Sequence, residues 1–248
     1  MIGRVIRHWP TLLALLVLAC YSPFLARQAF DRVPGPSPPG VVRRIPVRGR
    51  WVALAFDDGP SPLETPRVLQ VLAQYHAHAS FFVVGLNVHR RESLLRQMMR
   101  DGDGVENHTD GHINLAAHSY SQDLADLKAA NRAVEMVTGR RPYWLMPPYD
   151  AVDPTVRRAA AAAHLHLVEA SPGENVANGV LSTAAVIHQV LAHVEPGSIV
   201  VLHDGPGNLA VVHALPSILS LLQIEGYRVG SLNQVMLSNR SAWRPSSH

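Results

Sequence analysis

Two neighbouring carboxylates at the end of an apolar run are the side chains best placed to do chemistry in this chain. Residues 51–56 are apolar and predict a buried strand, Asp57 and Asp58 follow it directly, and Gly59 and Pro60 end it. Two adjacent acids that lose hydration repel each other, which costs free energy unless a positive charge lies near them. We therefore expect a cation beside this pair.

Two imidazoles complete the pattern further along the chain. His108 and His112 are four positions apart, with Thr109, Asp110 and Gly111 between them. One carboxylate and two imidazoles form a ligand set that binds a divalent metal and leaves positions open for water and substrate. The second carboxylate is then free to act as a base, so the pattern predicts a metal-dependent catalytic centre.

A regular alternation of short apolar runs and amphipathic stretches surrounds these residues. We predict strands over residues 52–56, 79–83, 104–107, 143–146, 164–168, 198–202 and 227–230, and helices over 66–75, 91–101, 121–138, 154–163, 183–194 and 210–226. Alternating strands and helices with short connections imply a parallel sheet. The predicted fold class is therefore α/β, a distorted (β/α) barrel of about seven parallel strands.

Such a fold explains how residues that are scattered along the chain can form one site. Parallel strands bring their carboxyl ends to one face of a barrel, and barrel active sites lie at that face. Candidate residues follow five of the predicted strands: Asp57 and Asp58, His108 and His112, Pro147 to Tyr149, Glu174, and His203 with Asp204. The topology thus predicts that these residues converge in space.

Each of these residues also has a plain structural explanation when it is taken alone. Asp58 would suit a turn or a helix cap, His108 and His112 a polar surface loop, and His203 the core. Residues 147–149 would suit a rigid turn, and residues 204–207, which read Asp-Gly-Pro-Gly, are interpreted as a turn only. Taken singly, these structural explanations stay open.

Length, charge and cysteine content narrow the classes of function. A chain of 248 residues can bury the core of a barrel-sized domain. The net charge is +3 without a basic stripe that carries aromatic residues, so nucleic acid is not an expected partner, whereas an acidic cell-wall polymer fits. Cys20 is the only cysteine, so an intrachain disulfide is excluded and any metal must be held by His, Asp or Glu.

The first thirty residues are typical of a targeting segment. Arg4 and Arg7 precede an apolar stretch, and residues 17–20 resemble a lipoprotein cleavage box that ends at Cys20. An uncleaved membrane anchor, a cleaved signal peptide and a lipoprotein signal all remain open. Each of them predicts an extracytoplasmic protein, either membrane-anchored through a single span or a lipid, or secreted.

The rest of the chain divides into three predicted parts. Residues 31–50 are rich in proline and glycine and predict a linker that holds the domain away from the membrane. Residues 51–238 form the predicted catalytic domain, and residues 239–248 form a polar tail. The sequence predicts no oligomeric state.

Five short motifs in order resemble those of the polysaccharide deacetylases, which are carbohydrate esterase family 4 with its NodB homology domain. Residues 56–60 (FDDGP), 108–112 (HTDGH) and 201–203 (VLH) match the first, second and fifth motifs. Residues 146–149 (MPPY) match the third less well, and residues 171–175 (SPGEN) match the fourth poorly. The resemblance covers about residues 52–236, essentially the whole predicted domain.

The resemblance implies a hydrolase that removes N-acetyl groups from amino-sugar polymers, with peptidoglycan or a chitin-like glycan of the cell envelope as the N-acetylated substrate. It implies a divalent metal, usually Zn2+, whose ligands are Asp58, His108 and His112. Asp57 takes the place of the base and His203 that of the acid that protonates the leaving amine. The backbone N–H of Tyr149 would help to stabilise the oxyanion.

The third motif departs from the family pattern at Met146, where the family usually has an arginine. That arginine contacts the base and keeps it charged. Without it, Asp57 loses stabilisation worth about 1–3 pKa units and is expected to titrate nearer neutrality, unless another cation holds it.

The fourth motif departs further, because Ser171, Glu174 and Asn175 stand where the family has Asp, Asp and Trp. Glu174 is expected to keep a charge that tunes the acid His203. Loss of the tryptophan removes an apolar wall of the acetyl pocket. These departures leave an alternative open, a catalytically weakened glycan-binding or scaffold domain of the same fold.

Overall fold

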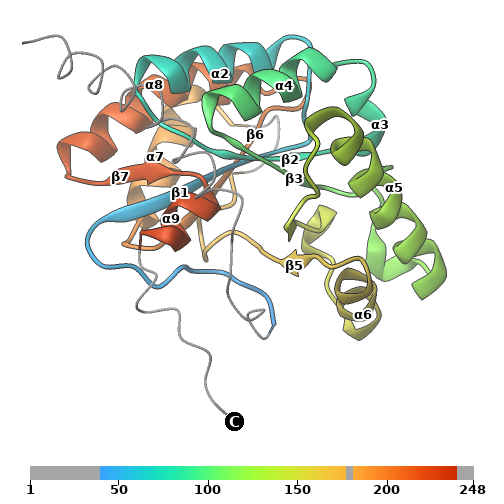
Figure 1. The fold of residues 1–248 in the computed structure, drawn as a ribbon. Coiled ribbons are helices and arrows are strands. Elements are labelled where there is room, and N and C mark those ends of the chain that lie inside the picture. Colours follow the sequence, from blue (N-terminus) through green and yellow to red (C-terminus); the bar gives the residue numbers. More distant parts are fainter. Residues whose placement is uncertain (1–39, 177–180, 239–248) are drawn as a thin grey trace, which may run out of the picture. The chain divides into compact units, whose positions relative to one another are not determined.

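Seven parallel strands form the centre of the part of the chain that the computed structural model describes, residues 40–176 and 181–238 (Figure 1). They are β1 (Trp51–Asp57), β2 (Ser80–Val83), β3 (Gly104–Asn107), β4 (Trp144–Leu145), β5 (His166–Leu167), β6 (Ile199–His203) and β7 (Arg228–Gly230). Their order is β5-β4-β3-β2-β1-β6, and β7 pairs with the first three residues of β1. All seven strands lie within or next to predicted ranges.

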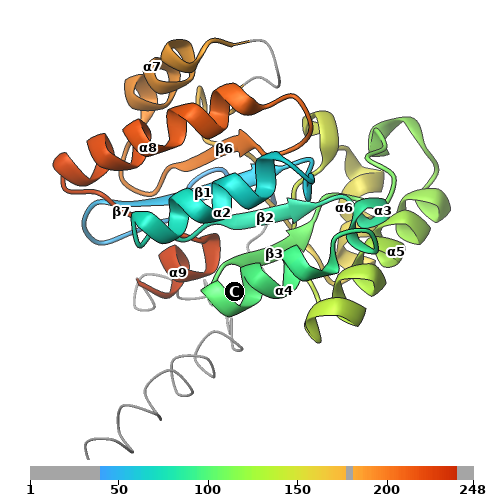
Figure 2. The same ribbon diagram turned by 90° about the horizontal axis from the view of Figure 1, so that it is seen from above.

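Eight helices of the described residues pack around this sheet. They are α2 (Glu64–Gln74), α3 (Gly85–Val88), α4 (Glu92–Asp101), α5 (Tyr120–Thr138), α6 (Pro154–Ala162), α7 (Thr183–His193), α8 (Leu209–Ile224) and α9 (Leu232–Leu237). Figure 2 shows α8, α2 and α4 side by side across β1, β2 and β3. Along the layer α7 packs on α8, α8 on α2, α2 on α4, α4 on α5, and α5 on α6. The six predicted helices are confirmed, whereas α3 and α9 are too short for a clear periodic pattern.

Because helices or loops cover both faces of the sheet, its strands are apolar throughout. In β1 every residue after Trp51 is buried, which is why residues 51–56 form an unbroken apolar run instead of an alternating one. Phe56 and Phe81 stack in the core with ring centroids 5.3 Å apart. The aspartates at the end of β1 are therefore fixed by a rigid, fully packed strand.

The edges of the sheet, β5 and β6, are joined by irregular segments instead of by a direct strand pair. Val42 bridges to Val168 just after β5, and Asn175 bridges to Val201 in β6. The sheet is thus a curled α/β arrangement of parallel strands, which fits the predicted distorted barrel.

Part of the predicted linker, residues 31–50, belongs to this packed domain. Val42 and Ile45 are buried, their N–H groups donate to the carbonyls of Leu167 and Gly197, and Arg43 pairs with Glu169. Their apolar side chains fill the space between β5 and β6, so the packed domain begins before Trp51.

The predicted targeting segment (residues 1–30) and polar tail (residues 239–248) lie outside the described residues. Within residues 40–176 and 181–238, no helix has the length and apolarity that a membrane crossing requires.

Local signals in the sequence explain where the longest helix begins and ends. Ser119 and Gln122 form a capping box at the start of α5, in which the side chain of each accepts a hydrogen bond from the backbone N–H of the other. Gly139 ends the helix in the left-handed conformation with φ 70°. From within α5, Asp126 accepts hydrogen bonds from the N–H groups of residues 110 and 111. These bonds fix the loop that carries His108 and His112 against the helix.

Candidate active site

The carboxyl ends of the strands surround a cleft of about 370 Å³. It is lined by Asp57, Asp58, His108, His112, Tyr149 and His203, all singled out from the sequence, together with Pro147, Asp150 and Asn175. Asp57 lies opposite His203 in the register of β1 and β6, which brings the expected base and acid to neighbouring strand ends. The topology therefore gathers six of the seven predicted site residues, and Glu174 is the exception.

Three of these side chains offer a compact set of metal ligands. One ligand atom each from Asp58, His108 and His112 lies within 4.8 Å of the other two. Asp58 Oδ1 is 2.9 Å from His112 Nε2 and 3.4 Å from His108 Nε2. The donor set of one carboxylate oxygen and two imidazole nitrogens fits a divalent metal such as zinc.

Hydrogen bonds behind the two imidazoles orient them for this role. His108 Nδ1 is 2.7 Å from the carbonyl oxygen of Met146, which can only accept, so Nδ1 carries the proton and Nε2 keeps its lone pair for a metal. His112 Nδ1 lies 3.3 Å from the hydroxyl of Tyr149. Met146 thus supports a ligand through its backbone, although its side chain lacks the charge that the family has there.

Backbone strain is concentrated around the same cleft. Asp58, Thr109, His112, Tyr149 and Asp150 have φ values of 71°, 66°, 53°, 62° and 52°, in the left-handed region that side chains other than glycine rarely adopt. Such conformations cost free energy and persist only where packing enforces them, which is typical of functional sites.

Asp57 is buried at the bottom of the cleft. Burial raises the pKa of its carboxyl well above the ordinary value, and the charges of Asp58, Asp204 and Asp150 raise it further. In the lining of the cleft, no lysine or arginine among the described residues replaces the arginine that the family has at Met146. A metal held by Asp58 and the two histidines would place a positive charge next to Asp57.

Asp58 behaves in the opposite way. Burial raises the pKa of its carboxyl, but the interactions with the imidazoles of His108, His112 and His203 together outweigh burial and hold the pKa far below its usual range. Asp58 therefore stays ionised, as a metal ligand must.

His203 is enclosed by the protein beside these groups. Burial lowers the pKa of its imidazole, and the charge of Asp58 and the backbone carbonyl of Val176 counteract burial only in part. An acid of this kind is protonated less readily than an exposed histidine.

Glu174 is not part of the cleft. It is fully buried beside Ser198 and His193, and burial raises the pKa of its carboxyl to about 7. Ser198 precedes β6, whereas His203 ends that strand, so the structure does not bring Glu174 to the acid. The cause is the alternation of side chains in an extended segment, because the next residue, Asn175, faces the cleft and Glu174 faces away from it.

Asp204 is a residue whose place the sequence did not reveal. It was expected to lie in a simple turn, but it is fully buried, and the hydroxyl of Thr65 donates a hydrogen bond to its Oδ2. Burial raises the pKa of the carboxyl to about 7. A side chain at Gly59 would overlap this carboxylate, so Asp204 holds the loop after β6 tightly against the loop after β1. Thr65, a polar residue facing inward on α2, was the available signal.

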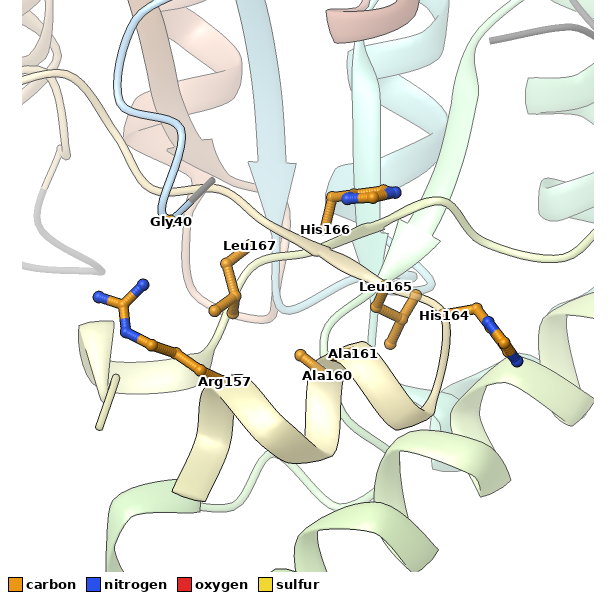
Figure 3. A pocket seen from close by; sticks show the side chains of 8 residues that line it. All are labelled: Gly40, Arg157, Ala160, Ala161, His164, Leu165, His166 and Leu167. Atoms are coloured by element: carbon orange, nitrogen blue, oxygen red, sulfur yellow. The ribbon is translucent and has the colours of Figure 1, made fainter. Parts of the chain in front are cut away.

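Figure 3 shows a second pocket of about 310 Å³ between α6 and the chain around β5. Arg157, His164 and His166 supply its ionisable side chains, and no carboxylate lines it. The ring of His166 stacks against Tyr143 with centroids 4.2 Å apart, which gives it a structural partner. Among the described residues this pocket offers no carboxylate beside its imidazoles, whereas the cleft at the strand ends combines the metal-ligand set with Asp57, so that cleft is the candidate active site.

Comparison with known proteins agrees with this geometry. The family model described as polysaccharide deacetylase matches residues 44–168. A peptidoglycan-N-acetylglucosamine deacetylase of Bacillus cereus is 31% identical over 209 residues, which cover 79% of this chain and 92% of that protein. A chitooligosaccharide deacetylase of Sinorhizobium fredii is 36% identical over 172 residues, 65% of this chain and 77% of that protein.

A solved structure extends the comparison to three dimensions. The crystal structure of a peptidoglycan N-acetylglucosamine deacetylase in complex with an N-oxidanyl-benzamide superposes with a TM-score of 0.73 at 26% identity, and the match covers 79% of this chain and 92% of the other. Motifs, fold and cleft therefore lead to one assignment. The chain belongs to the polysaccharide deacetylase family, hydrolases that act on the carbon–nitrogen bond of N-acetyl groups.

Proposed function

We propose that this protein is a metal-dependent hydrolase that removes N-acetyl groups from an amino-sugar polysaccharide of the cell envelope, either peptidoglycan or a chitin-like glycan. The observation that carries the proposal is the ligand set of Asp58, His108 and His112 in one cleft with Asp57 and His203. The names of the relatives, which are deacetylases of peptidoglycan and of chitooligosaccharides, support the same substrate class.

The metal would be held by Asp58 and the Nε2 atoms of His108 and His112, and we expect zinc from the ligand types. When bound, it supplies Lewis-acid polarisation of the acetamide carbonyl and lowers the pKa of water from about 16 towards 7. The Met146 carbonyl keeps the ring of His108 in the tautomer that this role needs.

Asp57 acts as the base that takes the proton from the attacking water. A base must be ionised, and burial together with three neighbouring carboxylates opposes this at Asp57. A cation held by the adjacent Asp58 favours the charged form. We therefore infer that Asp57 becomes a competent base chiefly in the loaded protein.

His203 donates a proton to the leaving nitrogen, because an amine anion is a poor leaving group. The lowered pKa of its imidazole means that only a fraction is protonated at neutral pH. The backbone N–H of Tyr149, in the strained turn η2 (Pro148–Asp150), is proposed to donate to the developing oxyanion.

Acetate release provides the test. The full-length protein, loaded with zinc and then treated with a chelator, is incubated with N-acetylated glucosamine oligomers and with peptidoglycan fragments, and free acetate is measured. We expect release that the chelator abolishes and that Asp57→Asn reduces by at least about a hundredfold. Asp101→Asn, on the exposed end of α4, is the matched control with the same change of charge.

An alternative function has a specific observation in its favour. The cleft lacks an arginine beside Asp57, and the polar Asn175 stands in place of the family's tryptophan, as a catalytically weakened glycan-binding domain would tolerate. Zinc binding and glycan binding without acetate release, unchanged in Asp57→Asn, would establish this binding function and end the enzymatic proposal.

We further propose that residues 1–30 place the domain outside the cytoplasm, as a membrane-anchored or secreted protein, and that nucleic acid is not a partner. The apolar stretch after Arg4 and Arg7 supports the location. Digestion of intact cells or spheroplasts by an added protease tests it. Protection of the domain until the cells are lysed would contradict the proposal.

A further inference from the structure

A polar pair stands at the mouth of the cleft, at the ends of two different strands. Asp150 belongs to the turn after β4, and Asn175 lies in the segment that pairs with β6. Asn175 Nδ2 donates a long hydrogen bond of 3.4 Å to Asp150 Oδ2, and both residues are exposed while lining the cleft. A substrate bound in the cleft therefore lies within reach of this pair.

The backbone holds the Asp150 carboxylate in this place at a cost. Asp150 has φ 52° and follows Tyr149 at φ 62°, two successive left-handed residues without glycine. The amide of Asn175 is its neighbour across the cleft, and that amide is neutral. The strained turn thus presents a negative charge at the entrance, with no opposite charge supplied by Asn175.

Charge across the cleft is unbalanced in the same direction. Its lining includes three carboxylates, those of Asp57, Asp58 and Asp150, and no lysine or arginine among the described residues. A divalent cation held by Asp58, His108 and His112 would balance the charge of Asp58 and of the adjacent Asp57. Asp150 would remain as a negative charge in the cleft lining that the cation does not balance.

We propose that Asp150 determines charge specificity: it favours glycan chains whose sugars near the reacting unit carry free amines, and it disfavours chains that carry a carboxylate there. The inference deepens the proposed deacetylase function, on which it rests. Each reaction would then create an amine that improves binding of the remaining chain, so partly deacetylated polymer would be preferred over untouched polymer. Because Asp150 is exposed, we expect an effect of about two- to fivefold that falls with ionic strength.

Binding of two matched oligomers that are not substrates tests the charge role without turnover. A β-1,4-linked glucosamine pentamer and a glucose pentamer differ only in carrying an ammonium or a hydroxyl group on each sugar. Their affinities for the zinc-loaded full-length protein are measured by calorimetry at low ionic strength and at a pH where the amines are protonated. The variants are Asp150→Asn, Asp150→Glu and the remote control Asp101→Asn.

We expect the ratio of glucosamine to glucose affinity to fall about two- to fivefold in Asp150→Asn, and to be kept in Asp150→Glu and Asp101→Asn. An unchanged ratio in Asp150→Asn, or an equal fall in Asp101→Asn, overturns the proposal. If Asp150→Asn does not fold, the ratio of glucosamine to glucose affinity is measured for the unmodified protein at low and at high salt. A ratio that high salt leaves unchanged also overturns the proposal.

Turnover gives an independent readout and separates this proposal from the proposed function. Acetylated oligomers in which a neighbouring sugar carries a free carboxylate are compared with neutral acetylated oligomers. The ratio of their kcat/KM values, charged over neutral, should be higher in Asp150→Asn than in the unmodified protein by a similar factor. Absence of acetate release from every oligomer would refute the deacetylase, whereas release with unchanged charge ratios would refute only the role of Asp150.

Discussion

Replacement of the buried Glu106 by glutamine should remove one distinct contribution to the pH dependence of stability, beside those of the buried Asp57, Glu174 and Asp204. Glu106 lies in β3, and its Oε2 accepts hydrogen bonds of 2.8 and 2.9 Å from the N–H groups of Tyr143 and Trp144. β3 and β4 pair through one residue position each, Asn107 opposite Leu145. The side chain of Glu106 therefore extends this short ladder and positions β4, after which the Met146 carbonyl contacts His108, a proposed metal ligand.

The magnitude follows from the two pKa values. Burial raises the pKa of Glu106 from 4.5 to about 7, and the hydrogen bonds from Trp144 and Tyr143 lower it only in part. The folded protein keeps this proton up to about pH 7, whereas the unfolded chain releases it above about pH 4.5. The stabilisation is thus complete below the unfolded pKa and is lost as pH rises through 7. The full loss is about 3 kcal/mol, of which about 1 kcal/mol has gone by pH 5, so about 2–3 kcal/mol is lost between pH 5 and pH 8.

Chemical denaturation of the unmodified protein and of Glu106→Gln at pH 5 and pH 8 measures this difference. The amide oxygen of glutamine still accepts both N–H groups, and it has no charge to bury at either pH. We expect the fall in the free energy of unfolding between pH 5 and pH 8 to be about 2–3 kcal/mol smaller in Glu106→Gln than in the unmodified protein. Glu225→Gln, an exposed residue 3.8 Å from Arg50, serves as control and should follow the unmodified protein. Equal pH dependence in Glu106→Gln would refute the reasoning.

Three further predictions concern the cleft. Met146→Arg should shift the acid limb of the pH profile of kcat/KM by about 1–3 pH units towards lower pH, because a cation would favour ionised Asp57. Met146→Leu is the control. An unshifted profile in Met146→Arg would show that another group already keeps Asp57 ionised. Thr65→Val should lower the free energy of unfolding by about 1–3 kcal/mol, since it removes the donor to the buried Asp204; denaturation measures this, and Thr65→Ser should restore it. Zinc at a hundredfold excess over its Kd should raise the free energy of unfolding by about 2.7 kcal/mol, and stabilisation that persists in His112→Ala would contradict the assigned ligand set.

The strands and long helices could be predicted because each carries its own periodic signal. A parallel strand covered on both faces is an unbroken apolar run, as in β1, and an outer helix repeats apolar residues at 3.6-residue spacing, as in α2 and α8. Residues 41–45 give no such signal. Val41 and Val42 form only a pair, and Ile45 stands alone between Arg44 and Pro46, so the burial of Val42 and Ile45 is evident only from the packing beside β5 and β6.

Site residues could be predicted where the motif also sets the direction of the side chain. Asp57 and Asp58 end a strand whose register is fixed, so their position relative to His203 follows from the topology. Glu174 has the expected type of side chain, but in an extended segment a shift of one position turns it to the opposite face. Asn175 occupies the direction that faces the cleft, and sequence spacing alone could not reveal this.

The backbone position of Asp58, the proposed metal ligand, depends on residues that do not line the cleft. A side chain at Gly205 would lie 2.5 Å from the Cβ of Asp58, and one at Gly59 would overlap the Asp204 carboxylate, so two glycines and one buried acid let the loops after β1 and β6 touch. Asp58 is held at φ 71° by this contact. If the loops moved apart, that strain would relax, and the carboxylate would turn away from His108 and His112. The position of the ligand is thus set by backbone packing between two loops, which explains why a residue that resembles an ordinary turn, Asp204, is buried beneath the catalytic cleft.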